Sequence, residues 1–405
     1  MNEYHIILYY KYVLLDNPEK EKEQQQIICK SNNLDGRILL SNEGINGTLA
    51  GSSYDNIQSY IDYLCSHPAF QMTESDFKHS NTISDVKPFP YLQIRLVKEV
   101  VSTGYDQEKL KFPNMNVESK EERGYLTPKE FHKAIEEGNA NNDMILLDVR
   151  NHYEYSIGHF DNAIDPKVRT FSEYLEYIKK RSGEFENKKV LMYCTGGIRC
   201  EKASNFLRKE CNSQDNVYHL QGGIHKYLQQ YHDGGYFKGK NFVFDKRIAM
   251  NASSDENNVV VGKCIECRCD YDELKPFNLC TVCRDMVLSC PKCISKLNGE
   301  LHCERHQYLK ECYFTFLQYY AKDELIMQLV KLKEIYKENE FNPEWKKKRK
   351  MLRKQMDKVE CRINDFNLGV VSIPEERSGM FHCRTCFQLG CNGRCWGYWV
   401  DDRDS

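Results

Sequence analysis

The first hundred residues alternate between short apolar runs and polar segments of helix length. Apolar runs of four to ten residues predict strands, and a proline at the start of a polar run is typical of the first turn of a helix. Strands are predicted at residues 4–13, 36–40, 45–51 and 91–101, and helices at 17–33 and 54–65. The order β-α-β-β-α-β predicts a ferredoxin-like α+β domain over residues 1–101, with both helices on one face of its sheet.

A second α/β pattern covers residues 123–240 and follows a polar, aperiodic stretch at 102–122 that is predicted to be a linker. Buried strands are predicted at 144–149, 190–193 and 217–220. Thr127 and Glu130, with Pro128 between them, have the spacing of a capping box at the start of a helix. Alternating strands and helices predict a parallel sheet with helices on both faces, and ligands then bind at the carboxyl ends of the strands.

The strongest chemical feature lies at the carboxyl end of the strand predicted at 190–193. Cys194 follows this strand directly, and a helical pattern begins after Arg199. The loop between them consists of Thr195, Gly196, Gly197 and Ile198. Unpaired N–H groups and the positive end of the helix favour a thiolate here, so Cys194 is predicted to be the nucleophile and Arg199 a fixed positive charge beside it. An inert, buried cysteine is the alternative, but it would leave the adjacent glycines without a purpose.

Five further residues are expected near this loop. Asp148 and Arg150, at the end of an earlier strand, are predicted to form an internal ion pair that orders the Cys194 loop. Cys200 either resolves an oxidised form of the nucleophile or serves as packing, and packing is favoured. His159 and His225 are candidate proton carriers, although a hydrogen-bonded structural histidine is the favoured role for each.

The segment at 241–306 is predicted to bind zinc, because it contains three CxxC pairs followed by further cysteine and histidine. Two CxxC hairpins complete a tetrahedral structural site. The candidate ligands are Cys264, Cys267, Cys280, Cys283, Cys290, Cys293, His302, Cys303 and His306. The simplest assignment places the first four cysteines on one zinc. The next two, with two of the three downstream residues (His302 and Cys303 in the preferred set), then hold a second. A cross-braced pairing is equally allowed.

The remaining chain is predicted to form a helical segment at 307–366, broken at Pro343, and a cysteine-rich tail at 367–405. The second helix begins with Lys346, Lys347, Lys348, Arg349 and Lys350. Such a block can bind RNA phosphates through counterion release, although a solvated face or a localisation signal is the favoured explanation. The tail contains a third set of zinc-ligand spacing, formed by Cys383, Cys386, Cys391 and Cys395.

Composition limits the classes of partner and compartment. A net charge of −2 over 405 residues provides no global field for nucleic acid, so any RNA surface must be local. No apolar run approaches a membrane span, and the amino-terminal stretch MNEYHIILYYKYVLLDN is predicted to be a strand and not a signal peptide. Nineteen cysteines without a secretory signal favour a reducing, cytoplasmic location, where clustered cysteines bind metal. The oligomeric state is not indicated.

Several motifs resemble known families. Asp148-Val149-Arg150-Asn151, Glu154, Gly158-His159 and the loop from Cys194 to Arg199 resemble a rhodanese domain. The chain also resembles the tRNA uridine hydroxylase family over roughly residues 1 to 300. This resemblance rests on four longer motifs: GRILLSNEGINGTLAG, CTGGIRCEKAS, QGGIHKY and FKGKNFVFD. The first of these motifs is expected either to help bind tRNA or simply to form a tight hairpin through Asn42, Glu43 and Asn46.

This resemblance implies an enzyme that hydroxylates C5 of the wobble uridine in the tRNA anticodon loop, with molecular oxygen as co-substrate and Cys194 as nucleophile. The main alternative is a rhodanese-type sulfurtransferase that carries a persulfide on Cys194, although such an enzyme needs no amino-terminal domain. A zinc-built RNA-binding scaffold with a vestigial loop is a third interpretation, and the intact loop disfavours it. A phosphatase is disfavoured because related phosphatase loops are one residue longer. Beyond about residue 307 the chain departs from the family.

Overall fold

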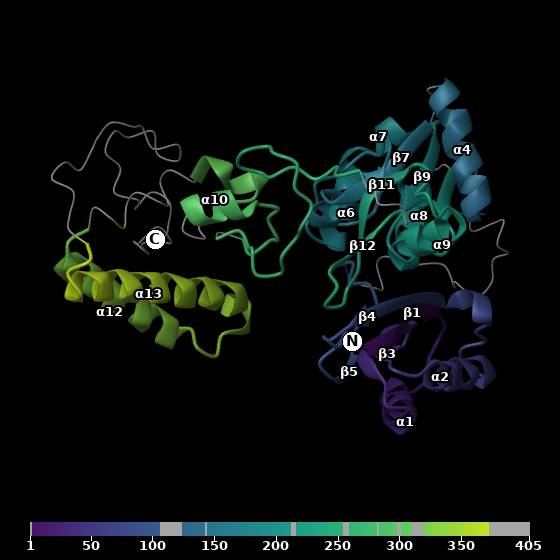
Figure 1. The fold of residues 1–405 in the computed structure, drawn as a ribbon, viewed down its shortest axis with the longest axis horizontal. Coiled ribbons are helices and arrows are strands. Elements are labelled where there is room, and N and C mark those ends of the chain that lie inside the picture. Colours follow the sequence, from purple (N-terminus) through teal and green to yellow (C-terminus); the bar gives the residue numbers. More distant parts are fainter. Residues whose placement is uncertain are drawn as a thin grey trace. The chain divides into compact units, whose positions relative to one another are not determined.

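The computed structural model describes residues 2–105, 124–141, 144–211, 216–253, 259–281, 283–297, 301–309, 317 and 320–371. The chain divides into two compact units, one of residues 1–264 with 268–275 and one of residues 265–267 with 276–405 (Figure 1). The predicted linker lies mostly outside the described residues, and the four tail cysteines lie entirely outside them. Within the described ranges, no helix combines the length and the apolar character that a membrane span needs.

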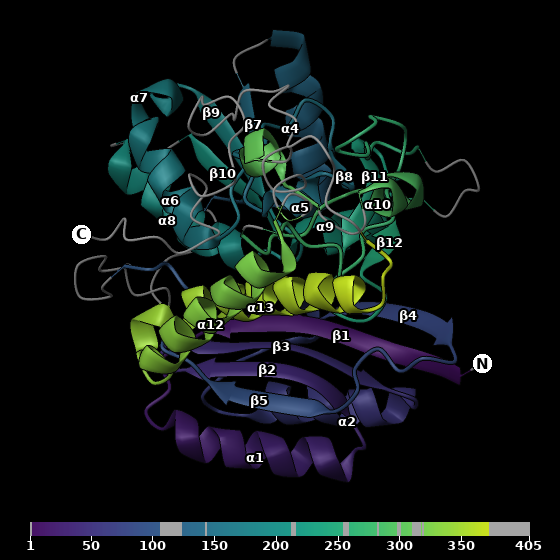
Figure 2. The same cartoon turned by 90° about the vertical axis from the view of Figure 1, so that its left-hand side faces the viewer.

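The first part of the larger unit is an α+β domain with a five-stranded sheet of order β4-β1-β3-β2-β5. Its elements are β1 (Asn2–Tyr12), α1 (Pro18–Ser31), β2 (Asp35–Ser41), β3 (Gly44–Gly51), α2 (Tyr54–Ser66), β4 (Lys78–Ser84) and β5 (Leu92–Leu96). Both helices lie on one face of the sheet, as predicted (Figure 2). Ile38, Ile57 and Leu64 are part of the core between the helices and this face. Among the described residues, the domain places no helix on the opposite face.

The last strands of this domain differ from the prediction. The fourth strand of the ferredoxin-like pattern is β4, which pairs antiparallel with β1 and was missed. Its sequence, KHSNTIS, has no apolar run, because it lies at the edge of the sheet and most of its side chains are at least partly exposed. The strand expected at 91–101 is the shorter β5, an additional edge strand that pairs in parallel with β2.

The second part of the larger unit is a four-stranded parallel sheet of order β6-β10-β9-β7. Its elements are β6 (Tyr125–Leu126), α4 (Pro128–Asn141), β7 (Met144–Asp148), α5 (His152–Tyr155), β8 (Gly158–Phe160), α6 (Phe171–Lys180), α7 (Ser182–Phe185), β9 (Lys189–Tyr193), α8 (Ile198–Glu210), β10 (Val217–Leu220) and α9 (Gly223–Gln230). The strands β11 (Phe237–Phe242) and β12 (Ala249–Asn251) form a small antiparallel sheet with β8. The predicted parallel sheet is therefore present.

Alternate residues of the central strands divide the core of this domain into two layers. Leu147 and Met192 pack with buried residues of α6 and α8, whereas Leu146 and Leu191 pack with residues of α4 and α9. The sheet is thus covered by helices on both faces, which explains its continuous apolar strands. Because Asp148 pairs with Tyr193, β7 and β9 end at the same edge. This shared edge brings together the residues that follow the two strands.

The smaller unit contains a cysteine-rich segment and a pair of helices. The cysteine-rich segment includes the short helix α10 (Pro291–Lys296) and a 3-10 helix, Glu304–Leu309. The long helices α12 (Lys322–Glu338) and α13 (Lys346–Asn367) lie side by side (Figure 1). They bury an apolar seam of Leu325, Leu332, Leu352 and Val359. The break predicted at Pro343 is found, as a 3-10 turn over Pro343–Trp345.

Candidate active site and metal centres

Cys194 lies where β9 turns into α8, and its side chain is fully buried. The backbone N–H of Gly197 donates a hydrogen bond to its Sγ atom at 3.1 Å. Burial alone would raise the pKa of the Cys194 thiol. A hydrogen bond from Cys200, the charge of Arg199 and the backbone N–H groups of both residues outweigh burial and lower this pKa to about 5. Cys194 is therefore a thiolate at neutral pH, which is the form that acts as a nucleophile.

The two glycines of the loop are required because β1 of the amino-terminal domain approaches it closely. A Cβ atom on Gly196 would lie 2.7 Å from Cδ2 of Leu8. A Cβ atom on Gly197 would lie 2.8 Å from the hydroxyl oxygen of Tyr10. Gly197 also has a φ of 101°, in the left-handed region that disfavours a side chain. The amino-terminal domain therefore packs directly against the loop that carries Cys194.

Arg199 is held by Glu154, a residue of the rhodanese-like motif for which no role was predicted from the sequence. Its Nη1 and Nη2 atoms donate to the two carboxylate oxygens of Glu154 at 2.6 and 2.7 Å. Thr195 donates its hydroxyl proton to the same carboxylate at 3.1 Å. Burial would raise the pKa of Glu154, but the charge and hydrogen bonds of Arg199 hold it below its usual value. The local sequence feature that could have marked Glu154 is its position as the third residue of α5, where it completes a capping box.

The ion pair predicted between Asp148 and Arg150 is present, and both side chains are fully buried. The Nη2 atom of Arg150 donates to Asp148 Oδ2 at 2.6 Å and to the carbonyl oxygen of Gly158 at 2.7 Å. These bonds connect the end of β7 to the start of β8. The pair therefore orders the edge of the sheet around the active-site loop.

The other predicted supporting residues agree in part with their expected roles. His159 stacks on the ring of Tyr155, and its Nδ1 atom lies 2.9 Å from the carbonyl oxygen of that residue. Burial lowers the pKa of His159, and burial also lowers the pKa of His225 to about 4. Both rings are therefore neutral at pH 7, which fits the favoured structural role. Cys200 is fully buried, but its hydrogen bond to Cys194 gives it an electrostatic effect beyond packing.

A pocket of about 590 Å³ lies against the active-site loop. One wall includes Cys194, Thr195 and Arg199, with Phe244 nearby, and the other wall is the helix-free face of the amino-terminal sheet. This volume lies in the range of ligand-binding pockets, roughly 300–1,000 Å³. Cys194 thus lies at a cavity to which both domains of the larger unit contribute.

The motif at residues 36–51 forms β2, a turn and β3, as the hairpin interpretation expected. Its Glu43 has a further role, because its Oε1 atom accepts hydrogen bonds from the backbone of Val100 at 2.6 Å and from Lys202 Nζ at 2.9 Å. Lys202 is a buried residue of α8 that also donates to Glu99 at 3.1 Å. This charge cluster, centred on the buried Lys202, fastens the amino-terminal domain to α8.

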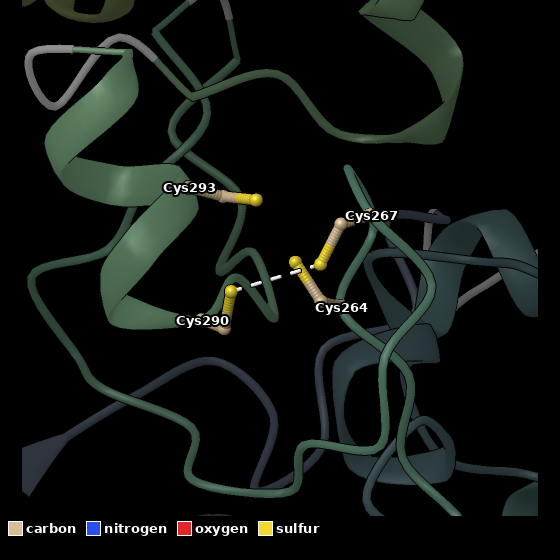
Figure 3. Close-up of side chains that lie close together, drawn as sticks. All are labelled: Cys264, Cys267, Cys290 and Cys293. Carbon is tan, nitrogen blue, oxygen red and sulfur yellow. Dashed lines mark hydrogen bonds between the residues drawn. The ribbon is translucent and has the colours of Figure 1, made fainter.

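Two groups of side chains in the cysteine-rich segment have the composition and spacing of metal sites. The first contains Cys264, Cys267, Cys290 and Cys293 (Figure 3), and the second contains Cys280, Cys283, Cys303 and His306. Within each group the ligand atoms all lie within 4.8 Å of one another. The structure groups these side chains in the cross-braced arrangement and not in the simpler sequential one. Among the described residues, His302 belongs to neither group. His306 is the histidine ligand of the second group, in place of the predicted His302.

The distances in both groups fit a tetrahedral ion with thiolate ligands. A Zn–S bond of about 2.3 Å places neighbouring sulfur atoms about 3.8 Å apart in a tetrahedron. Cys267 Sγ lies 3.8 Å from Cys290 Sγ, and Cys283 Sγ lies 3.7 Å from Cys303 Sγ. Each group supplies four ligands, which fills the coordination of a structural metal and leaves no open position for catalysis.

The basic stretch at the start of α13 is only partly open to solvent. Lys346 and Lys350 are exposed, whereas Arg349 donates to the carbonyl oxygen of Asn339 at 2.9 Å and so satisfies the end of α12. The side chains of Lys347 and Lys348 lie outside the described residues. Of the five basic residues at 346–350, Arg349 therefore forms a hydrogen bond between α13 and the end of α12.

The parallel sheet, the Cys194 loop and its two buried ion pairs define a rhodanese-like domain joined to a ferredoxin-like one. Family models match the chain in three parts: an acylphosphatase-like domain named UPF0176 at residues 4–100, a rhodanese-like domain at 127–230 and a rhodanese carboxy-terminal region at 238–312. Residues 313–405, which include α12 and α13, lie beyond these three matches.

Curated relatives give the family. A tRNA uridine(34) hydroxylase of Aster yellows witches'-broom phytoplasma is 38% identical over 312 residues, which cover 77% of this chain and 91% of the relative. Its counterpart in Bacillus licheniformis is 36% identical over 316 residues, or 77% of this chain and 87% of the relative. Rhodanese-like domain-containing protein 6 of Arabidopsis thaliana is 34% identical over 322 residues, but this chain covers only 53% of it. The chain belongs to the tRNA uridine(34) hydroxylase family.

Proposed function

We propose that this protein is a tRNA-modifying oxidoreductase that hydroxylates the wobble uridine, position 34, in the anticodon loop. The observation that carries the proposal is the Cys194 thiolate, whose pKa is lowered to about 5, at a pocket bounded by both domains. The family named for this reaction supports the same assignment. The target base lies in a single-stranded loop, where an enzyme can reach it without opening a duplex.

In the proposed mechanism, the Cys194 thiolate adds to C6 of the uracil ring and makes C5 electron-rich. Molecular oxygen then supplies one oxygen atom to C5, and the other oxygen atom leaves as water. The balance requires two electrons and two protons, which a thiol reductant provides as it is oxidised to a disulfide. Loss of the C5 proton and departure of Cys194 from C6 restore the aromatic base.

The residues around Cys194 support its addition and its departure. The hydrogen bond from Gly197 N–H and the charge of Arg199 stabilise the thiolate, which is both the attacking group and the leaving group. Glu154 fixes the guanidinium of Arg199 in place through two hydrogen bonds. These groups are held before substrate arrives, so little reorganisation is needed during the reaction.

The remaining parts of the chain have proposed supporting roles. Each of the two metal groups holds a structural zinc ion. The stretch from Lys346 to Lys350, despite the use of Arg349 within the helical pair, is a proposed second contact for tRNA phosphates. Because the substrate is tRNA, the proposed place of action is the cytoplasm.

The test is to incubate purified protein with unmodified tRNA, a thiol reductant and ¹⁸O₂, and to analyse the nucleosides by mass spectrometry. The proposal expects one ¹⁸O atom in hydroxyuridine from position 34 and no product under nitrogen. The sulfurtransferase alternative expects unmodified tRNA, with thiocyanate released from thiosulfate and cyanide instead. Label from H₂¹⁸O in the product would exclude oxygen as the co-substrate.

A further inference from the structure

Two rows of side chains cross the amino-terminal wall of the active-site pocket. Strand pairing aligns Leu8 with Thr48, Thr48 with Arg37, and Arg37 with Gln93, and it aligns a second row two residues along each strand. The second row consists of Tyr10, Asn46, Leu39 and Arg95. Residues two apart in a strand project from the same face, and all eight side chains line the pocket. The rows begin at the glycines of the Cys194 loop, which Leu8 and Tyr10 approach closely.

Each row carries an arginine with no ion pair in the described part of the chain. Arg37 and Arg95 are both exposed, although the protein as a whole has a net charge of −2. Adjacent strands are about 4.8 Å apart, so Arg37 on β2 starts about 10 Å and Arg95 on β5 about 14 Å from β1. An RNA base placed against Cys194 would therefore leave these cations at the distance of the backbone of the flanking nucleotides.

The opposite wall of the pocket presents an aromatic ring. Phe244 is 43% exposed and lines the pocket together with Cys194. The guanidinium carbon of Arg199 lies 5.8 Å from the centre of the Phe244 ring. An exposed aromatic ring and exposed cations that line one pocket are the chemistry by which proteins hold single-stranded RNA, through base stacking and phosphate contacts.

We propose that this pocket is the binding site for the single strand of the anticodon loop, in which Arg37 and Arg95 contact phosphates that flank the target and Phe244 stacks on a base. The inference rests on the proposed function and adds the residues that hold the substrate. It also assigns a role to the face of the ferredoxin-like sheet that carries no helix of its own domain.

The experiment measures binding of a fluorescent anticodon stem-loop RNA, by anisotropy without oxygen, over a range of salt concentrations. It compares the wild type with Arg37→Ala/Arg95→Ala, with Arg37→Lys/Arg95→Lys and with Phe244→Ala. Lys20→Ala/Lys30→Ala is the matched control, because it removes two exposed cations from α1 on the helix-covered face. Alkylation of Cys194 by iodoacetamide checks in each variant that the loop is folded.

Each phosphate contact on a single strand contributes about 0.7 to the magnitude of the slope of log K against log salt. The arginine-to-alanine variant loses two such contacts, so the magnitude of its slope should fall by about 1.4. The lysine variant should keep most of this slope, and the α1 control should match the wild type. Phe244→Ala should weaken binding by about 5-fold to 150-fold at every salt concentration, with little change in slope.

An unchanged slope and affinity in the arginine-to-alanine variant would overturn the inference, even if the wild type hydroxylates tRNA normally. Failure of the wild type to bind the stem-loop would also overturn it. If the wild type binds through these residues but forms no hydroxyuridine, the binding site stands and the proposed function fails. The two proposals are therefore separated by the same set of proteins.

Discussion

Arg199 and Glu154 form a bidentate ion pair beside Cys194, with nitrogen-to-oxygen distances of 2.6 and 2.7 Å. The side chain of Glu154 is fully buried and that of Arg199 is 12% exposed. Arg199 therefore has one fixed orientation, from which its charge lowers the pKa of the Cys194 thiol. The pair connects α5 to the start of α8 across 45 residues of sequence.

Glu154→Gln should destabilise the protein strongly, because it leaves the Arg199 charge largely buried without a partner. Removal of one partner from a buried ion pair costs about 3 kcal/mol or more. Urea unfolding measures this loss as a lower midpoint. Glu184→Gln is the control, since its partner Arg181 is exposed on the same domain, and its midpoint should hardly move. Equal midpoints for the two variants would contradict the role given to Glu154.

The rate at which iodoacetamide alkylates Cys194 should follow a pKa of about 5. Because only the thiolate reacts, the rate should rise as the pH increases through 5 and be constant from about pH 6.5, where almost no thiol remains. Mass spectrometry of the peptide that contains Cys194 separates it from the other cysteines.

Cys200→Ala should move this profile to higher pH, because it removes the hydrogen bond that favours the thiolate. A wild-type midpoint near 8.5, the ordinary value for a cysteine, would show that the loop does not activate the thiol.

Lys202→Ala should weaken the attachment of the amino-terminal domain to α8. The substitution leaves Glu43 and Glu99, which share the Lys202 ammonium group, without their cation, and we expect a loss of about 3 kcal/mol in the free energy of unfolding. Lys209→Ala, at an exposed position on the same helix, should have little effect. If both variants unfold at the same urea concentration, the cluster does not join the two domains.

Zinc content should report the cross-braced arrangement of ligands. Cys267→Ser and Cys283→Ser should each remove about one zinc ion per chain by elemental analysis, and the double variant should remove two. Sequential pairing would put both residues on the same ion, so the double variant would then lose only one. Cys269→Ser is the control, because Cys269 is exposed and belongs to neither group.

Local patterns in the sequence were sufficient for the parallel sheet and for the position of Cys194. The run VLMY, the two glycines and the start of a helix are contiguous, so strand, loop and helix dipole are all determined within about fifteen residues. The Asp148–Arg150 ion pair could also be predicted from the sequence, because its members are two residues apart. β4 was missed because an edge strand of polar residues carries no apolar run.

Contacts between distant residues were not predictable in the same way. Lys202 and Glu43 are 159 residues apart, and neither has a local pattern that marks it as an interdomain contact. The CxxC pairs marked six of the eight candidate metal ligands, but which hairpin meets which depends on how the segment folds back on itself. The rows that contain Arg37 and Arg95 depend on strand register, which pairs residues from four separate strands.

The catalytic role of Cys194 is tested directly by hydroxylation of position 34 with wild-type protein, Cys194→Ala and Cys211→Ala, measured by nucleoside mass spectrometry. Cys211 is a buried cysteine at the end of α8, so its variant controls for loss of a thiol from the same core. We expect hydroxyuridine with the wild type and with Cys211→Ala, and none with Cys194→Ala. Product formed by Cys194→Ala at the wild-type rate would contradict the proposal that this thiolate carries the reaction.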